Sequence, residues 1–249
     1  MNTESGALAA LVLGFLLGLK HATDADHVVA VSTIVNQYKN ALRGLWVGVS
    51  WGLGHTAPLV VLGLIILAFK GAVIDFYDSI ASIFEFGVGI MLVFLGIQVY
   101  WNLRKGRLHV HQHDHDGNAH MHIHGTHQAL EDPEVEKPHI SFSLGKPFFR
   151  MKSFVIGMVH GLAGSAAVML ALLPTIDSFI VGVLYLLLFG LGTVMSMAVI
   201  TIILSLPFAI SGSHKTINNT VSGIAGAASV ILGIALMLEI STDSTILPF

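Results

Sequence analysis

Six stretches of the sequence are almost continuously apolar, and each is long enough to cross the hydrocarbon core of a bilayer as a helix. They lack the alternation of polar and apolar positions that marks a transmembrane β-barrel. Pro174 and Pro207 end the fourth and fifth stretches, because proline cannot continue a helix. The pattern predicts a polytopic all-α membrane protein with six spans, at Gly6–Val35, Leu45–Phe69, Ile80–Leu103, Ser153–Leu173, Phe179–Leu206 and Val221–Glu239.

The first stretch is longer than a span requires. About 30 residues form about 45 Å of helix, against a hydrocarbon core of about 30 Å. The stretch is also interrupted by the polar run His21–His27, which is His-Ala-Thr-Asp-Ala-Asp-His. The length and the interruption together predict a helix that is either strongly tilted or broken near this run.

A hydrophilic insert separates two sets of three apolar stretches. We therefore divide the chain into a first membrane repeat (1–103), the insert (104–150) and a second membrane repeat (151–249). Lysine and arginine concentrate in the connections on the side of the insert, whereas the opposite side carries only Lys70. The positive-inside rule then places the insert in the cytoplasm and both termini outside. The expected location is the cytoplasmic (inner) membrane.

The two halves share a weak internal repeat. Gly18 and His21 match Gly157 and His160 at an offset of 139 residues. Two further matches follow in order, Gly52-Leu53-Gly54 with Gly190-Leu191-Gly192 and Leu95-Gly96-Ile97 with Leu232-Gly233-Ile234. Three helices per half give the halves opposite orientations, so the fold predicted is a 3+3 inverted repeat, as in many secondary transporters. The second half replaces most candidate ligands, with Ala163, Ser165 and Thr193 standing opposite Asp24, Asp26 and His55.

Composition narrows the possible chemistry. Of 249 residues, 54% are hydrophobic and only 11% are charged, against about 25% charged residues in soluble domains. Cysteine is absent, which excludes thiolate metal sites, disulfides and thiol redox chemistry. The net charge of −3 and the lack of a basic cluster give no indication of a nucleic-acid partner. Any transition-metal site must use histidine, carboxylate, methionine or backbone ligands.

The polar interruption of the first stretch is the main functional indication. An ionisable side chain at membrane depth costs about 2.5–3.5 kcal/mol on insertion scales, so these groups must face protein, water or a bound ion. The four candidate ligands are His21, Asp24, Asp26 and His27. In a continuous helix, His21, Asp24 and His27 share one face, and Asp26 points away, as an outer partner or as a ligand for another helix. An unwound turn would bring all four together.

Imidazole combined with carboxylate suits a borderline divalent ion such as Ni²⁺, Co²⁺, Zn²⁺ or Cu²⁺. The alternative is a buried structural network, in which Lys20 pairs with Asp24 and the histidines bond backbone carbonyls. Two histidines outside this run are further candidates. His55 follows two glycines that permit close helix approach, and His160 is the repeat partner of His21; each is either a ligand or a core residue. Weaker candidates are Glu85, Met195 and Met197.

The insert contains a tract rich in histidine, with Asp114 and Asp116 among the imidazoles. Its histidines are His109, His111, His113, His115, His120, His122, His124 and His127. Such tracts typically bind metal, and this one is too polar and flexible for a rigid selective site. It is predicted to buffer or hand off metal and to be dispensable for transport. The alternative is a solubilising linker.

These motifs resemble a known family. His21-x4-Asp26-His27 resembles the signature of the nickel/cobalt transporter (NiCoT) family, and Leu53-Gly54-His55-Thr56 resembles its second motif. The stretch Gly157–Ala167 is more similar to the shorter, urease-accessory (UreH-like) branch. The resemblance covers most of both halves and implies uptake of Ni²⁺ or Co²⁺, with His21, Asp26, His27 and His55 in metal recognition. The chain departs from longer members by lacking their Phe-Asp-Thr-Ala-Thr-Glu pattern and by having six predicted spans rather than eight.

The predicted function is secondary transport, with Ni²⁺ and/or Co²⁺ taken up through His and Asp ligands of the first two helices. The alternatives are a Ni/Co exporter, or a membrane metallochaperone or urease accessory protein without transport. His21-x4-Asp26 also matches an acyltransferase spacing, but the Pro-Glu-Gly block and catalytic domain of those enzymes are absent, so no enzymatic activity is expected. No cofactor is expected. Expected partners are the divalent ion, the lipid bilayer and cytoplasmic nickel chaperones, without nucleic acid.

Overall fold

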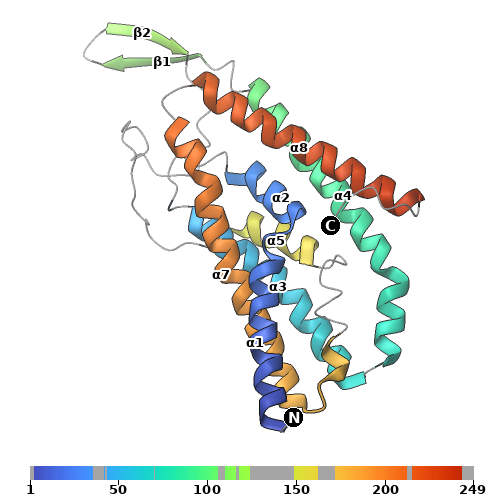
Figure 1. Cartoon of the computed structure of the whole chain (residues 1–249). Coiled ribbons are helices and arrows are strands. Elements are labelled where there is room, and N and C mark those ends of the chain that lie inside the picture. Colours follow the sequence, from blue (N-terminus) through green and yellow to red (C-terminus); the bar gives the residue numbers. More distant parts are fainter. Residues whose placement is uncertain are drawn as a thin grey trace.

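The computed structural model describes residues 3–35, 42, 44–69, 71–105, 110–115, 118–123, 149–161, 172–211 and 215–242. These residues are helical apart from one short hairpin and a few connecting residues (Figure 1). The helices are α1 (Thr3–His21), α2 (Ala25–Val35), α3 (Gly44–Phe69), α4 (Gly71–Lys105), α5 (Met151–Gly161), α7 (Phe179–Ser211) and α8 (Lys215–Thr242), with a 3₁₀ turn, η4, at Leu173–Thr175.

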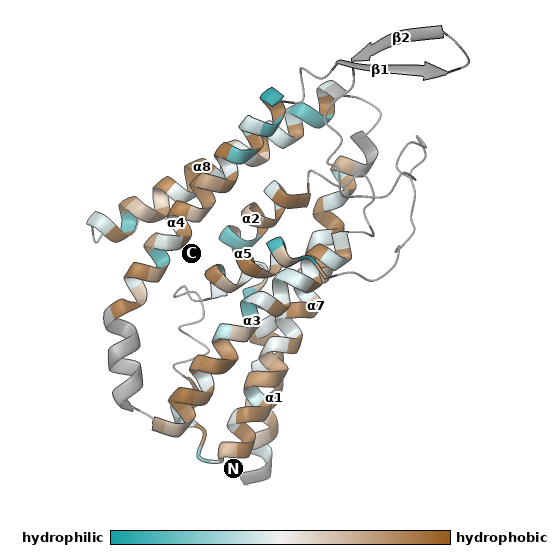
Figure 2. Ribbon diagram, turned by 180° about the vertical axis from the view of Figure 1, so that it is seen from behind, coloured by the Kyte–Doolittle hydropathy of each residue, from teal (hydrophilic) through white to brown (hydrophobic). Residues whose placement is uncertain are grey.

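Four helices are long and apolar enough to cross a membrane, in α3, α4, α7 and α8. A fifth candidate is the pair α1 and α2, which are bent by 52° at a short break. Many large apolar side chains on these helices face outward, including Phe94, Ile180 and Ile203, and the long helices are predominantly hydrophobic in Figure 2. An outward apolar surface of this kind suits lipid rather than water. The prediction of a multi-pass helical membrane protein is confirmed at this level.

The fourth predicted span, Ser153–Leu173, is not confirmed. α5 has 11 residues, about 16 Å of helix, which is too short to cross the hydrocarbon core. Residues 162–171, which the prediction assigned to the same span, lie outside the described residues. The six-span count and the 3+3 repeat therefore stay predictions.

The prediction that Pro207 ends its helix is wrong. α7 continues to Ser211 with Pro207 inside it. Proline removes one backbone donor and crowds one carbonyl, and near the end of a long, packed transmembrane helix the remaining contacts outweigh that loss. Similarly, α3 passes through Pro58 without ending. α4 begins nine residues before the predicted start, at Gly71, because its polar first turns lowered the local hydropathy without preventing a helix.

The first apolar stretch is broken rather than merely tilted. The Thr23 hydroxyl donates to the Lys20 carbonyl at 2.6 Å, and the Asp24 amide donates to the His21 carbonyl at 3.2 Å, so tight turns replace the helical ladder. Threonine and aspartate side chains compete with helical hydrogen bonding in this way. The ladder resumes when the Val28 amide donates to the Asp24 carbonyl. The break turns the residues on its two sides toward different neighbours.

The helices form two groups joined by α2. In the first group, α7 packs against both α1 and α3, and α5 packs against α3. In the second group, on the other side, α4 packs against α8 (Figure 1). α2 lies between the groups and contacts helices of both. Its buried Ala30, Val31 and Ile34 share a core with Trp51 of α3 and Leu92 of α4. The residues just before α2 are therefore held at the centre of the protein.

Part of the histidine-rich insert forms a two-stranded antiparallel hairpin, β1 (Val110–His115) and β2 (Asn118–Ile123). Its backbone register pairs His111 with His122 and His113 with His120. This differs from the flexible tract that was expected. His109, His124 and His127 lie outside the described residues.

Candidate metal centre

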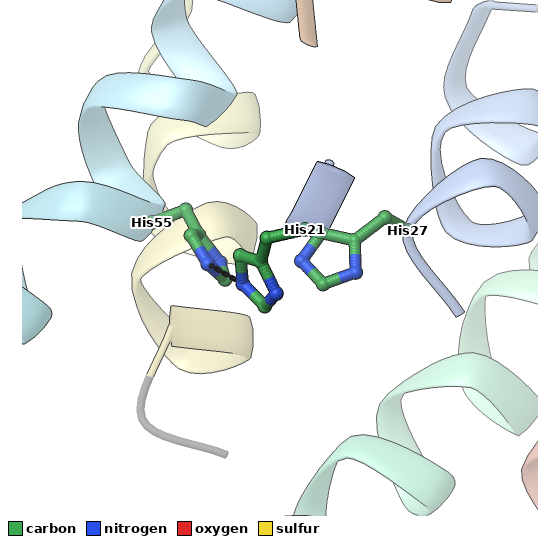
Figure 3. Close-up of side chains that lie close together, drawn as sticks. All are labelled: His21, His27 and His55. Carbon is green, nitrogen blue, oxygen red and sulfur yellow. Dashed lines mark hydrogen bonds between the residues drawn. The ribbon is translucent and has the colours of Figure 1, made fainter. Parts of the chain in front are cut away.

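Three histidines meet at the break between α1 and α2. His21 is the last residue of α1, His27 lies in the first turn of α2, and His55 lies in the middle of α3 (Figure 3). One nitrogen from each ring can be chosen so that all three lie within 4.8 Å of one another. His27 and His55 are fully buried and His21 is 4% exposed. Three imidazoles therefore share a small volume that is closed to bulk water.

The rings are arranged with nitrogens turned inward. The Nε2 atoms of His21 and His55 are 2.8 Å apart, and the His27 ring centroid is 4.6 Å from that of His21 and 4.8 Å from that of His55. Two nitrogens bound to one ion at about 2.1 Å are about 3.0 Å apart at a right angle and about 3.4 Å apart at a tetrahedral angle. The pair His21–His55 could therefore bind one ion after a movement of a few tenths of an ångström.

In the polar run His21–His27, each histidine has an aspartate next to its Nδ1 atom, the ring nitrogen on the side away from the centre. His21 Nδ1 is 3.2 Å from Asp24 Oδ2, and His27 Nδ1 is 2.8 Å from Asp26 Oδ1. A carboxylate that accepts an Nδ1–H proton leaves the lone pair of a neutral imidazole on Nε2. Both aspartates thus support the tautomer that presents Nε2 to the centre, as the outer partners of metal-bound histidines do.

The Nε2 atom of His27 is buried and has no hydrogen-bond partner among the described residues. His55 Nδ1 is in the same situation. A buried imidazole nitrogen without a partner forfeits a hydrogen bond that water would have provided, so most such atoms in proteins are paired. At His27 Nε2 an ion bound with His21 and His55 would supply the missing partner.

Asp26 also joins this cluster to the second half of the chain. Its Oδ2 atom accepts a hydrogen bond from Nε2 of His160, in α5, at 2.8 Å. Together, Asp26, His27 and His160 form a second group whose ligand atoms lie within 4.8 Å of one another. The rings of His27 and His160 are 4.2 Å apart between centroids. Four buried histidines and the partly buried Asp26 consequently form one continuous cluster.

The alternative to a metal site was a buried structural network of these side chains, and one contact of that network is present. Lys20 Nζ lies 3.2 Å from Asp24 Oδ1, as that alternative requires. The lysine side chain is 74% exposed, however, and the Asp24 side chain is 25% exposed, so the ion pair lies at the edge of the cluster. The imidazoles bond carboxylates and one another in the contacts described above, rather than backbone carbonyls.

The five main candidates from the sequence, His21, Asp24, Asp26, His27 and His55, are brought together with His160. Of the two arrangements considered, a continuous helix with His21, Asp24 and His27 on one face is excluded, and the unwound turn is observed, because the break separates His21 from the helix that carries His27.

The weaker candidates are not part of the cluster. Met197 is fully buried in an apolar core cluster, whereas Met195 is 49% exposed. Glu85 is in α4, a helix that contributes no residue to either group of possible ligands found in the described part of the chain.

Two aromatic residues at the cluster were not singled out from the sequence. The ring of Phe189 lies 5.6 Å from that of His21, and the ring of Trp51 lies 5.8 Å from that of His160. Trp51 precedes His55 by one helical turn, and Phe189 precedes Thr193, the repeat counterpart of His55, by the same spacing. Extending the repeated stretch Gly52-Leu53-Gly54 by one residue toward the N-terminus pairs Trp51 with Phe189 and would have identified both.

Comparison with known proteins decides the family. The chain is 38% identical over 233 residues to the urease accessory protein UreH of Bacillus sp. (strain TB-90), covering 94% of this chain and 92% of that protein. The chain belongs to the UreH family.

It is also 24% identical over 241 residues to chloroplast protein FOR GROWTH AND FERTILITY 1 of Arabidopsis thaliana and 25% identical over 231 residues to FOR GROWTH AND FERTILITY 2. These matches cover 95% and 91% of this chain but only 60% and 55% of the plant proteins. No family model and no solved structure matches.

Proposed function

We propose that this UreH-family protein is a secondary transporter that takes up Ni²⁺ and/or Co²⁺ across the cytoplasmic membrane. The observation that carries the proposal is the convergence of three buried imidazoles at the break of a candidate membrane span. Broken helices at membrane depth are typical of transporter substrate sites, because irregular backbone is tolerated where it lines a site. Imidazole-rich coordination suits Ni²⁺ and Co²⁺ better than Mg²⁺ or Ca²⁺.

Helix contacts support a 3+3 inverted repeat. Gly18 of α1 lies against the backbone carbonyl of Phe189 in α7, and Gly157 of α5 lies against the carbonyl of Trp51 in α3. The two glycines are 139 residues apart and the two aromatic residues 138, which are the offsets of the sequence repeat. A glycine of the first half thus contacts an aromatic residue of the second half, and the equivalent glycine of the second half contacts the equivalent aromatic residue of the first half.

The α4–α8 pair supports the same symmetry. Gly96 lies against the carbonyl of Gly226, and Gly89 and Gly233 lie against each other's carbonyls. At the offset of 137 residues, Gly89 corresponds to Gly226 and Gly96 corresponds to Gly233. The symmetry of the repeat therefore maps the contact between Gly96 and Gly226 onto the contact between Gly233 and Gly89. A pseudo-two-fold axis through this pair is what an inverted repeat requires.

The membrane potential is a sufficient driving force. Moving two charges across 100 mV is worth about 4.6 kcal/mol, from about 2.3 kcal/mol per charge, which corresponds to more than about a thousandfold accumulation. The proposed topology places the insert in the cytoplasm and both termini outside. Ions released from the cluster would then meet the histidine-rich insert, which we propose buffers them or passes them to a cytoplasmic nickel chaperone.

The test is Ni²⁺ and Co²⁺ flux into proteoliposomes at a controlled potential. The samples are the intact chain, His27→Ala, and Ser229→Ala as a control for a buried polar deletion. Ser229 donates to the Leu92 carbonyl in the α4–α8 contact and takes no part in the cluster. Inward, potential-driven flux that is lost in His27→Ala and kept in Ser229→Ala supports the proposal. Flux only in the outward direction would replace it with an exporter.

The name of the bacterial relative favours a second candidate, an accessory protein that binds nickel without transporting it. The same liposomes separate the two functions. Metal binding that depends on His27, with no flux in either direction at any potential, would establish the accessory role and exclude the transporter.

A further inference from the structure

His27 lies between two different sets of ligands. Its Nε2 atom faces the group with His21 and His55, whereas its Nδ1 atom lies 2.8 Å from Asp26, which in turn bonds His160. His27 is fully buried, and so is His160. His160 has its own buried Nδ1 atom without a hydrogen-bond partner in the described part of the chain. The cluster therefore has the donors for two coordination sets that share one ring.

We propose that the transported ion occupies a second position, bound by Asp26, His160 and Nδ1 of His27, after it leaves the centre of His21, His27 and His55. This inference rests on the proposed transport function. Two imidazoles and one carboxylate are a common ligand set for divalent first-row metals. The carboxylate oxygens are each already 2.8 Å from one of the two nitrogens, so the set is assembled before an ion arrives.

The two positions exclude each other. A neutral imidazole has one lone pair and one N–H proton. When Nε2 of His27 binds the ion, its Nδ1–H donates to Asp26; when Nδ1 binds the ion, the proton resides on Nε2. At His160 the proton moves correspondingly from Nε2 to the unpaired Nδ1, so no net proton release is required. The intact protein thus binds one ion in either of two environments, rather than two ions at once.

The second position differs from the first in its origin. His21, His27 and His55 all belong to the first half of the chain, whereas His160 belongs to the second half. A movement of one half against the other would leave the first set intact and make or break the second. The second position is therefore where metal binding and conformational change are coupled, and His160 is the residue through which the second half contacts the ion.

The test uses Co²⁺ binding to the full chain in detergent, followed by visible absorption, with the eight histidines of the tract His109–His127 replaced by asparagine. We call this protein the loop-silent chain. In it, we compare His55→Ala, His160→Ala, the double variant and Ser229→Ala. The expected results are one Co²⁺ per loop-silent chain, one Co²⁺ with an altered spectrum in His55→Ala, and at least a hundredfold weaker binding in the double variant. Two ions per loop-silent chain, or equal binding by His55→Ala and the double variant, would overturn the inference.

A flux measurement decides the matter if His55→Ala does not fold. In proteoliposomes, His160→Ala is expected to lower the maximal rate of Co²⁺ uptake at least tenfold while equilibrium affinity stays within threefold of the loop-silent chain. An unchanged maximal rate, or an equal loss of affinity and rate, would contradict a second position. If the intact chain neither binds nor transports Co²⁺, the proposed function itself fails, and these two failures are distinguishable.

Discussion

Gly54 lies where α3 closely approaches α5, the helix that carries His160. The glycine lies against the backbone carbonyl of Phe154 in α5, six residues before His160. Gly157 and Gly161 of α5 lie equally close to α3, against the carbonyls of Trp51 and His55. Gly54→Ala therefore changes the distance between two helices without touching any candidate ligand.

The size of the effect follows from the contact. A Cβ atom at Gly54 would lie 2.9 Å from the Phe154 Cα, against an ordinary separation of about 3.5–4.0 Å between carbons. The Phe154 carbonyl oxygen would lie still closer to this Cβ atom, so α3 and α5 must separate by roughly 1 Å to relieve the overlap. His160 moves with α5, whereas Asp26 is held in α2, so their 2.8 Å bond is expected to lengthen by up to that amount, to about 3.8 Å, beyond hydrogen-bonding distance. Overpacking costs about 1–3 kcal/mol, offset by up to about 1 kcal/mol for replacing glycine in a helix.

The assay pairs thermal unfolding in detergent with Co²⁺ uptake in proteoliposomes, and Gly223→Ala is the matched control. Gly223 lies in α8, and no atom lies within 4 Å of a Cβ built there. Gly223→Ala should be neutral or stabilising by about 0.5–1 kcal/mol, with unchanged uptake. Gly54→Ala should be about 0–2 kcal/mol less stable than the parent and transport about 10–100-fold more slowly. If the two variants behave alike in both measurements, the close approach at Gly54 does not position His160.

Further substitutions test the cluster, the insert and the α4–α8 contact. His27→Ala should abolish uptake, because it removes the ring shared by both ligand sets; uptake with normal affinity would remove His27 from the site. Asp26→Asn should weaken Co²⁺ binding by about 10–100-fold in titration calorimetry, and Asp24→Asn by less, since Asp24 is more exposed and its contact with histidine is longer; the reverse order would contradict the roles assigned. The loop-silent chain should keep the parent's uptake rate, and a large loss would make the insert part of the pathway. Ser229→Ala should lower the free energy of unfolding by about 1 kcal/mol without changing uptake.

Hydropathy was sufficient to find the long helices, because lipid requires continuous apolar surface. It located α3, α4, α7 and α8 within a few residues in most places, and the excess length of the first stretch predicted a break as one of two outcomes. Hydropathy gave the wrong helix bounds where a helical segment is not strongly apolar or contains proline. Residues 71–79 are too polar to score as a span but continue α4, and Pro207 is tolerated within α7 by surrounding contacts. The hairpin in the insert has no apolar alternation from which strands could be predicted.

The residues of the candidate centre could be named from the sequence, but their pairing could not. A helical projection shows which side chains share a face only where the helix is unbroken. Because the helix breaks at 22–24, the projection does not apply beyond His21. The sequence therefore left Asp24 as a possible ligand and Asp26 as a ligand or an outer partner, and it did not show that each lies against the Nδ1 atom of a histidine close to it in the sequence. The contact between Asp26 and His160 joins residues 134 positions apart and depends on the packing of α5 against α3.

The symmetry of the helices and the asymmetry of the ligands have different physical origins. Helix packing needs small residues at the crossings, so Gly18 and Gly157 are required in both halves for the same reason. Ligands for one ion do not have to be repeated in both halves, and a second imidazole at Thr193 would be a buried polar group without a function. Thr193 instead donates to the Phe189 carbonyl of its own helix, α7, and to the Gly18 carbonyl near the end of α1, which satisfies its hydroxyl within the backbone. The position opposite His55 thus stabilises the helix that ends in His21, and the second half supports the site of the first, with His160 as the one ligand candidate among its described residues.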